Sequence, residues 1–172
     1  MLRLLGALFV LAGAGGLGHL MACGLEEHAA VLRRFVAALQ HLESDIVFAS
    51  LPLPLALRRA AQTMSGGVGA FLEEVSTTLV QSDGKPLAAT WKAVLGRHAP
   101  ELLLETAEIE VLEGLGAALG GSDREDQAKH LALARTTLQG YSAEAQTRAE
   151  KGKRIWRYLG FSAGALAVIL LY

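Results

Sequence analysis

The chain has 172 residues, enough for one compact domain, and 52% of them are apolar, which is typical of a small membrane protein. Its 16 Lys and Arg residues against 17 Asp and Glu give a net charge of −1, so it lacks the field of one sign that attracts nucleic acid. A single cysteine, Cys23, excludes an intramolecular disulfide and a cysteine-rich metal centre.

The N-terminal segment 4–25 contains no Asp, Glu, Lys or Arg, and it holds one histidine, His19. As a helix it is about 33 Å long, close to the roughly 30 Å of a bilayer's hydrocarbon core. We therefore predict an N-terminal transmembrane helix over residues 1–25. Its many glycines allow close approach of a second helix, so the sequence is compatible with a homo-oligomer.

Three other interpretations of this segment stay open. The run after Arg3 fits a cleaved signal peptide, and Cys23 stands where an exported lipoprotein carries its lipid. A titratable group in lipid often marks function, so His19 also fits a small membrane transporter or enzyme component.

Residues 26–157 are predicted to be helical throughout. Apolar residues recur at three-four spacing after the first span, which indicates one buried helix face. They are Leu32, Phe35, Val36, Leu39, Leu42 and Ile46. Pro52 and Pro54 in LPLP interrupt this helix, and Pro54 opens the next one.

Glycine, serine and proline separate the following helices. The predicted helices cover residues 54–64, 68–80, 87–95 and 101–119. The last of these has an apolar stripe and stops at Gly120-Gly121. The stripe comprises Leu104, Ala107, Val111, Leu115 and Ala118.

The stretch GGSDREDQAKHL, residues 120–131, is densely charged. Ser122 followed by Glu125 is a capping box, and acidic residues in the first helical turn are favoured by the helix dipole. We predict Ser122 as the helix N-cap and the exposed charges as a candidate partner-docking surface. That surface consists of Asp123, Arg124, Glu125, Asp126 and Lys129.

The C-terminal segment 160–172, GFSAGALAVILLY, is wholly apolar or small and has Trp156 and Tyr158 as interfacial anchors. It predicts a C-terminal transmembrane helix over residues 158–172. Basic residues follow the first predicted span and precede the second. They are Arg33, Arg34, Lys151, Lys153, Arg154 and Arg157.

Because basic residues favour the cytoplasmic side of a membrane, we expect the middle of the chain in the cytoplasm and both termini outside. The predicted fold is all-α, a six-helix bundle domain at 26–157 between two transmembrane helices. No phosphate-binding loop or catalytic triad is readable. Asp126 and His130 share a helix face but lack the further ligands that a metal needs. We therefore expect no catalytic residue, cofactor or metal.

Five segments make the chain resemble the stage III sporulation protein AB family. They are MLRLLGA at the start, LESDI leading into PLP, KPLAATWKAVL, LGAALGGSDREDQAKHL at 115–131, and WRYLG before the terminal span. The fourth is the most specific, especially over residues 119–130. Two departures are visible: Leu55 stands where an acidic residue is usual, and Ala and Gly are enriched.

The resemblance implies a non-enzymatic member of a secretion-like complex that links mother cell and forespore during engulfment. It places the chain as a multi-pass protein in the mother-cell membrane facing the forespore. Its helical domain is similar to the cytoplasmic domains of the platform protein of type II secretion and type IV pilus machines. The implied partners are a cognate secretion-type ATPase, other membrane proteins of the same complex and the lipid bilayer.

Overall fold

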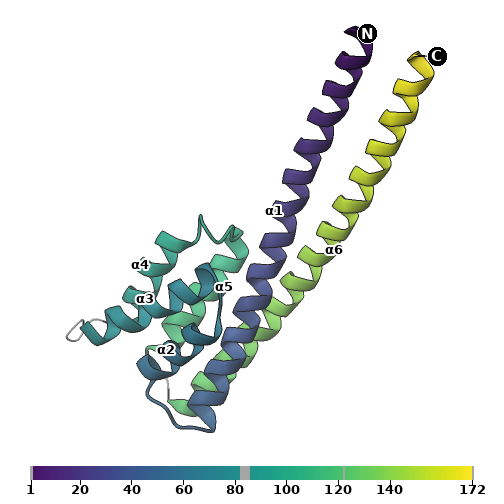
Figure 1. The fold of residues 1–172 in the computed structure, drawn as a ribbon. Helices are drawn as coiled ribbons and strands as arrows, with labels where there is room; N and C mark the ends of the chain where they lie inside the picture. Colours follow the sequence, from purple (N-terminus) through teal and green to yellow (C-terminus); the bar gives the residue numbers. More distant parts are fainter. Residues whose placement is uncertain (1, 82–85, 122, 172) are drawn as a thin grey trace. The chain divides into compact units, whose positions relative to one another are not determined.

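The computed structural model describes the backbone of residues 2–81, 86–121 and 123–171, and the side chains of residues 24–81, 86–121, 123–152 and 155. Over these residues the fold has six helices and no strand, so the predicted all-α class is confirmed (Figure 1). The helices are α1 (Leu2–Val47), α2 (Leu53–Thr63), α3 (Gly67–Gln81), α4 (Leu87–His98), α5 (Thr106–Leu119) and α6 (Arg124–Leu171).

The chain divides into two compact units, and each is described by itself. The first, which we call the helical pair, comprises Met1–Ala29 and Ala143–Tyr172, and the second, the globular unit, is Ala30–Ser142. Helix α1 continues through residue 25 and α6 through residue 157, so the predicted domain boundaries lie inside unbroken helices.

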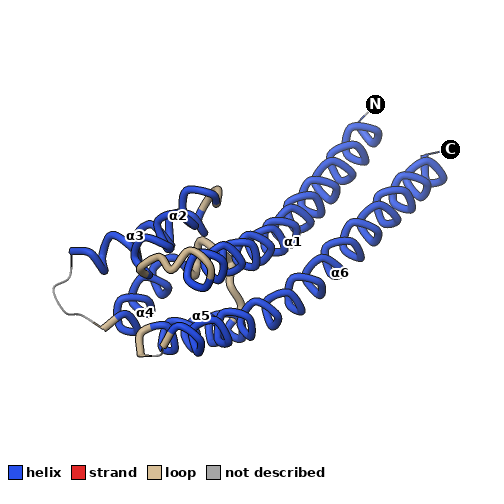
Figure 2. Tube along the Cα trace, turned by 90° about the horizontal axis from the view of Figure 1, so that it is seen from below, coloured by secondary structure: helices blue, strands red, loops and turns tan. Residues whose placement is uncertain are grey.

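In the helical pair, segments of α1 and α6 lie side by side, and both chain ends lie at one end of the unit (Figures 1 and 2). A Cβ added to Gly152 would lie 3.2 Å from Leu25 Cδ1, so the two helices approach closely there. Ala145 and Ala149, one turn apart on α6, are buried. Small residues at these positions permit that approach.

Over the part of the chain that the structure describes, no helix combines the length and apolar content needed to cross a membrane. That finding gives no support to the transmembrane helices predicted at 1–25 and 158–172, which stay predictions of the sequence. His19 and Cys23, on which the other interpretations depend, lie outside the residues whose side chains are described.

The core of the globular unit forms around the predicted stripe of α1. Leu32, Phe35, Leu39, Leu42 and Ile46 are all buried, and only Val36 of the predicted set is half-buried. The ring centroids of Phe35 and Phe71 of α3 lie 5.9 Å apart. The ring centroids of Phe71 and Trp91 of α4 lie 5.1 Å apart, in an edge-to-face arrangement. Such aromatic pairs contribute about 0.5–1.5 kcal/mol beyond the area that they bury.

Proline and glycine lie at the helix ends and turns, as the sequence predicts. Pro52 is the N-cap of α2, with Pro54 in its first turn, and Pro86 is the N-cap of α4. Gly66 turns the chain between α2 and α3 at a φ of 71°, which glycine adopts without strain. Gly120 ends α5. The short connections are visible as tan segments in Figure 2.

The fifth helix starts later than predicted, at Thr106 instead of Glu101. Leu103 has a φ of 55°, which is incompatible with a continuous right-handed helix. Glu105 then caps α5 in a reciprocal capping box, because the Glu105 N–H donates to Glu108 Oε2 at 2.8 Å. The prediction from the apolar pattern missed this start signal.

The predicted stripe of α5 is confirmed at Leu115, which is buried, and is wrong at its other four positions. Ala107 is exposed, and Leu104, Val111 and Ala118 are only half-buried. The buried face instead consists of Glu108, Leu112, Leu115, Gly116 and Leu119. The helix is turned so that Gly116 contacts Trp91 and the Glu108 carboxylate accepts the Glu105 N–H. Neither contact can be predicted from the spacing of apolar residues.

Candidate docking surface

Asp123 and the first turn of α6 carry the charged block that the sequence singles out. The Asp126 N–H donates to Asp123 Oδ1 at 3.0 Å, and the Gln127 N–H donates to the Asp123 carbonyl at 2.8 Å. Asp123 thus occupies the N-cap geometry of a helix that begins at Arg124. Ser122, the predicted N-cap, lies outside the described residues.

Lys129 forms ion pairs with two acidic side chains of this block. Its Nζ lies 3.1 Å from Glu125 Oε1 and 3.2 Å from Asp126 Oδ1, and hydrogen bonding to these carboxylates raises the pKa of Lys129. The acids therefore have a local cation as partner. Among the described residues no group of three or more His, Cys, Asp or Glu side chains could hold a metal, and Asp126 and His130 do not form one.

Two polar side chains fix the block to its neighbours in the globular unit. Arg124 Nη1 donates to Ser50 Oγ at 2.8 Å, and Gln127 Nε2 donates to the Leu119 carbonyl at 3.1 Å. Ser50 lies in the turn after α1 and has a φ of 52°. The exposed face of the block is consequently held on a preorganised helix start. All five predicted docking residues are exposed: Asp123, Arg124, Glu125, Asp126 and Lys129.

The predicted membrane-flanking basic residues are described only in part. Arg33 and Lys151 are exposed, whereas Arg34 is half-buried and contacts another group. The side chains of Lys153, Arg154 and Arg157 lie outside the described residues, although α6 carries their backbone. Their grouping at a membrane surface stays a prediction.

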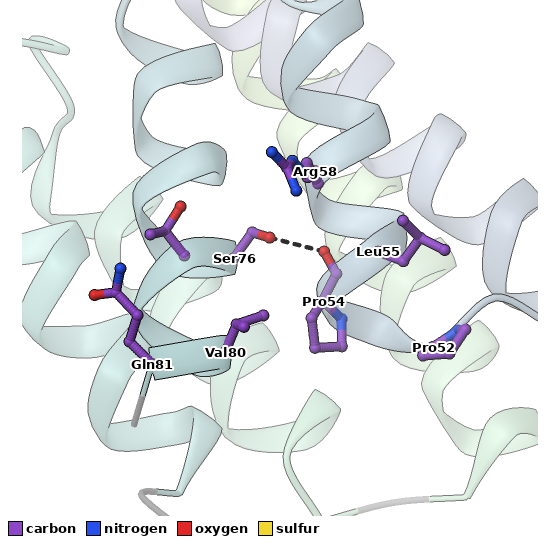
Figure 3. Close-up of a pocket in the computed structure, with 8 residues that line it drawn as sticks. Pro52, Pro54, Leu55, Arg58, Ser76, Val80 and Gln81 are labelled. Carbon is purple, nitrogen blue, oxygen red and sulfur yellow. Dashed lines mark hydrogen bonds between the residues drawn. The ribbon is translucent and has the colours of Figure 1, made fainter. Parts of the chain in front are cut away.

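A groove between α2 and α3 was not predicted from the sequence. It has a volume of about 340 Å³, and Figure 3 shows its walls. Leu55 is 47% exposed and Val80 is 72% exposed, and both line the same groove. Ser76 Oγ donates to the Pro54 carbonyl at 2.8 Å at the base of the groove and joins its two walls (Figure 3).

A second feature that the sequence did not reveal is the junction of Glu74 with the end of α4. Glu74 Oε2 lies 2.7 Å from His98 Nε2, and Glu74 Oε1 accepts hydrogen bonds from the Arg97 guanidinium. Hydrogen bonding to His98 and then to Arg97 lowers the pKa of Glu74 below its ordinary 4.5. These contacts are made by the last turn of α4, which continues to His98, beyond the predicted end at residue 95.

The sequence pattern matches one known family over almost its whole length. The profile of the stage III sporulation protein AB family covers residues 3–172. The chain belongs to this family. The resemblance carried by the five segments is therefore confirmed, and the chain is of a sporulation family.

Individual members agree with this assignment. The stage III sporulation protein AB of Bacillus subtilis (strain 168) is 34% identical over 171 residues, which are 99% of this chain and 99% of that protein. A solved structure of stage III sporulation protein AB has 32% identity and a TM-score of 0.65, and the match covers 72% of this chain and 97% of that one. Over the matched part, the chain therefore has the fold of that solved family member.

Proposed function

We propose that this chain is a non-enzymatic membrane component of the sporulation complex that links mother cell and forespore. In this role it is a platform whose globular unit docks a cognate secretion-type ATPase and other members of the complex. The proposal rests on the family match together with one structural observation: the start of α6, which carries the exposed charged block, is hydrogen-bonded to Ser50 and Leu119. A preorganised surface binds a partner with little loss of conformational entropy.

The proposed location is the mother-cell membrane, with the globular unit in the cytoplasm and both apolar ends in the lipid. Support comes from the uncharged segments 4–25 and 160–172 and from the basic residues that follow or precede them. The antiparallel course of α1 and α6 in the helical pair, with both chain ends at one end, also fits two crossings.

Partner recovery tests the docking role. The variant Arg124→Glu/Glu125→Lys reverses two exposed charges and leaves the net charge unchanged. The full-length variant, purified in detergent from sporulating cells, is expected to recover much less of the complex than the parent chain does. The matched control Glu144→Lys/Arg148→Glu reverses an exposed pair elsewhere on α6 and should recover the normal amount. Equal recovery by the two variants would contradict the proposed surface.

Labelling of a single cysteine tests the location. Glu110 is exposed on α5, so Glu110→Cys in a Cys23→Ala background places one thiol on the globular unit. A membrane-impermeant maleimide should label it only after protoplasts are permeabilised. Labelling of intact protoplasts, or release of the chain without detergent, would overturn the proposed topology.

A further inference from the structure

The groove between α2 and α3 is built as a fixed cleft. Helix α2 contributes Leu55 and Arg58 to one wall, and α3 contributes Thr77 and Val80 to the other. The Ser76 hydroxyl is used internally, because it donates to the Pro54 carbonyl at 2.8 Å. That bond crosses from one helix to the other and so connects the two walls of the groove.

One end of the groove is apolar and open. Pro52, Pro54, Leu55 and Val80 are the nonpolar lining residues of the groove, and Leu55 and Val80 are 47% and 72% exposed. Covering apolar surface is favourable by about 25 cal/mol for each Å² removed from water. The cavity of about 340 Å³ has room for an apolar side chain of the size of leucine or phenylalanine.

The other end of the groove carries a positive charge. Arg58 is the one charged residue that lines the cavity among the described residues, and its side chain is 62% exposed. Its Nε lies 3.7 Å from Glu73 Oε1, which is longer than a hydrogen bond, so this exposed pair is weak. A carboxylate from a partner can therefore bind the Arg58 guanidinium.

We propose that this groove binds an amphipathic helical segment of a partner protein, which places an apolar side chain against the exposed surface of Leu55, Pro54 and Val80 and a carboxylate, one turn later, against Arg58. Arg58 lies about one helical turn beyond Leu55 on α2, and an apolar residue and an acid three or four positions apart have the same spacing on the partner helix. Charge complementarity thus identifies an acidic amphipathic helix as the occupant.

This inference deepens the proposed docking function and rests on it, but it concerns the residues of α2 and α3 that line the groove and not the charged side chains of α6. The two can fail separately. Partner recovery with α6 variants reports on the block, whereas binding of a defined peptide to the purified chain reports on the groove alone.

The test uses the full-length chain in a zwitterionic detergent with ¹³C-labelled methyl groups. The probes are two alanine-based helical peptides, one with a leucine and a glutamate four residues later, the other with lysine in place of the glutamate. We expect the glutamate peptide to shift the methyl signals of Leu55 and Val80, and the lysine peptide to bind about five- to tenfold more weakly.

Charge reversal in the groove makes the test specific. Arg58→Glu should invert the preference between the two peptides, whereas Arg59→Glu should not, because Arg59 pairs with Asp45 at 3.4 Å and does not line the groove. Likewise Leu55→Asp should abolish binding, and Leu133→Asp, at an exposed leucine of α6, should leave it intact. Circular dichroism and a native methyl spectrum confirm that each variant is folded.

Three outcomes would overturn the proposal. They are an unchanged preference in Arg58→Glu, peptide-induced shifts that avoid Leu55 and Val80, and no binding of either peptide. A response of the same methyl groups to dihexanoyl-phosphatidylglycerol but to neither peptide would also overturn it and would identify the groove as a site for anionic lipid.

Discussion

The indole of Trp91 lies against the backbone of Gly116, so that a Cβ added at position 116 would be 2.9 Å from Trp91 Cβ and closer still to the ring. Trp91 is 1% exposed and also meets Phe71 edge-to-face at 5.1 Å. Glycine at this position therefore sets how closely α4 and α5 pack in the globular unit, and no larger residue fits without moving the ring.

Gly116→Ala is expected to lower the free energy of unfolding by about 1–3 kcal/mol, because the added methyl group overpacks the contact with Trp91. Urea unfolding of the full-length chain in detergent, followed by tryptophan fluorescence, measures the change. Gly114→Ala is the matched control: no atom lies within 4 Å of its Cβ position, and alanine favours a helix over glycine by up to about 1 kcal/mol. Equal midpoints for the two variants would contradict tight packing at Gly116.

Glu74 makes the stability of the globular unit depend on pH. Its pKa is lowered from 4.5 by hydrogen bonds to His98 and Arg97, so the folded chain binds a proton at Glu74 less readily than the unfolded chain does. The stabilisation is therefore fully present above pH 4.5 and is lost as the pH falls through the lowered pKa of the folded state.

Glu74→Gln should accordingly be less stable than the parent near neutral pH, and the difference should shrink below pH 4.5. Urea midpoints measured from pH 3 to pH 7 report this convergence. Glu110→Gln removes an exposed carboxylate of α5 and serves as the control. A stability difference that stays constant over that pH range would show that packing, and not the charge of Glu74, accounts for the effect.

Much of this fold could be predicted because the residues that start and end its helices act locally. Pro52, Pro54 and Gly120 impose backbone geometry through their own covalent structure, so the helix ends near them follow from the sequence. The stripe of α1 is also local, since three-four spacing puts apolar residues on one face whatever that face meets. These features required no knowledge of the partners in space.

Apart from the local capping box of Glu105 and Glu108, the features that were missed depend on contacts between distant residues. The register of α5 follows from Gly116 meeting Trp91, which lies 25 positions earlier and on another helix. The groove of Leu55 and Val80 exists only once α2 and α3 are placed together. Of the charged block, the sequence predicted the exposed residues but not the hydrogen bond from Arg124 to Ser50, which is 74 positions away.

Glu108 provides a test of the observed start of α5. It is 3% exposed, and its carboxylate accepts the Glu105 N–H at 2.8 Å. Glu108→Gln keeps an acceptor at the same place and should lose little stability, whereas Glu108→Ala should lose about 0.5–2 kcal/mol. Hydrogen exchange at the Glu105 amide should accelerate in the alanine variant alone. Acceleration in neither variant would contradict the capping box.

Asp123 allows the same reasoning at the start of α6, where the cap also supports the proposed docking surface. Asp123→Asn retains an oxygen that can accept the Asp126 N–H and should be nearly neutral, because Asn and Asp are comparable N-caps. Asp123→Ala should cost about 0.5–2 kcal/mol and fray the first turn, which carries Arg124 and Glu125. If that turn presents the docking charges, recovery of the sporulation complex should fall with Asp123→Ala and persist with Asp123→Asn. Loss of recovery with both variants, at unchanged stability of Asp123→Asn, would instead mean that the Asp123 carboxylate contacts the partner directly.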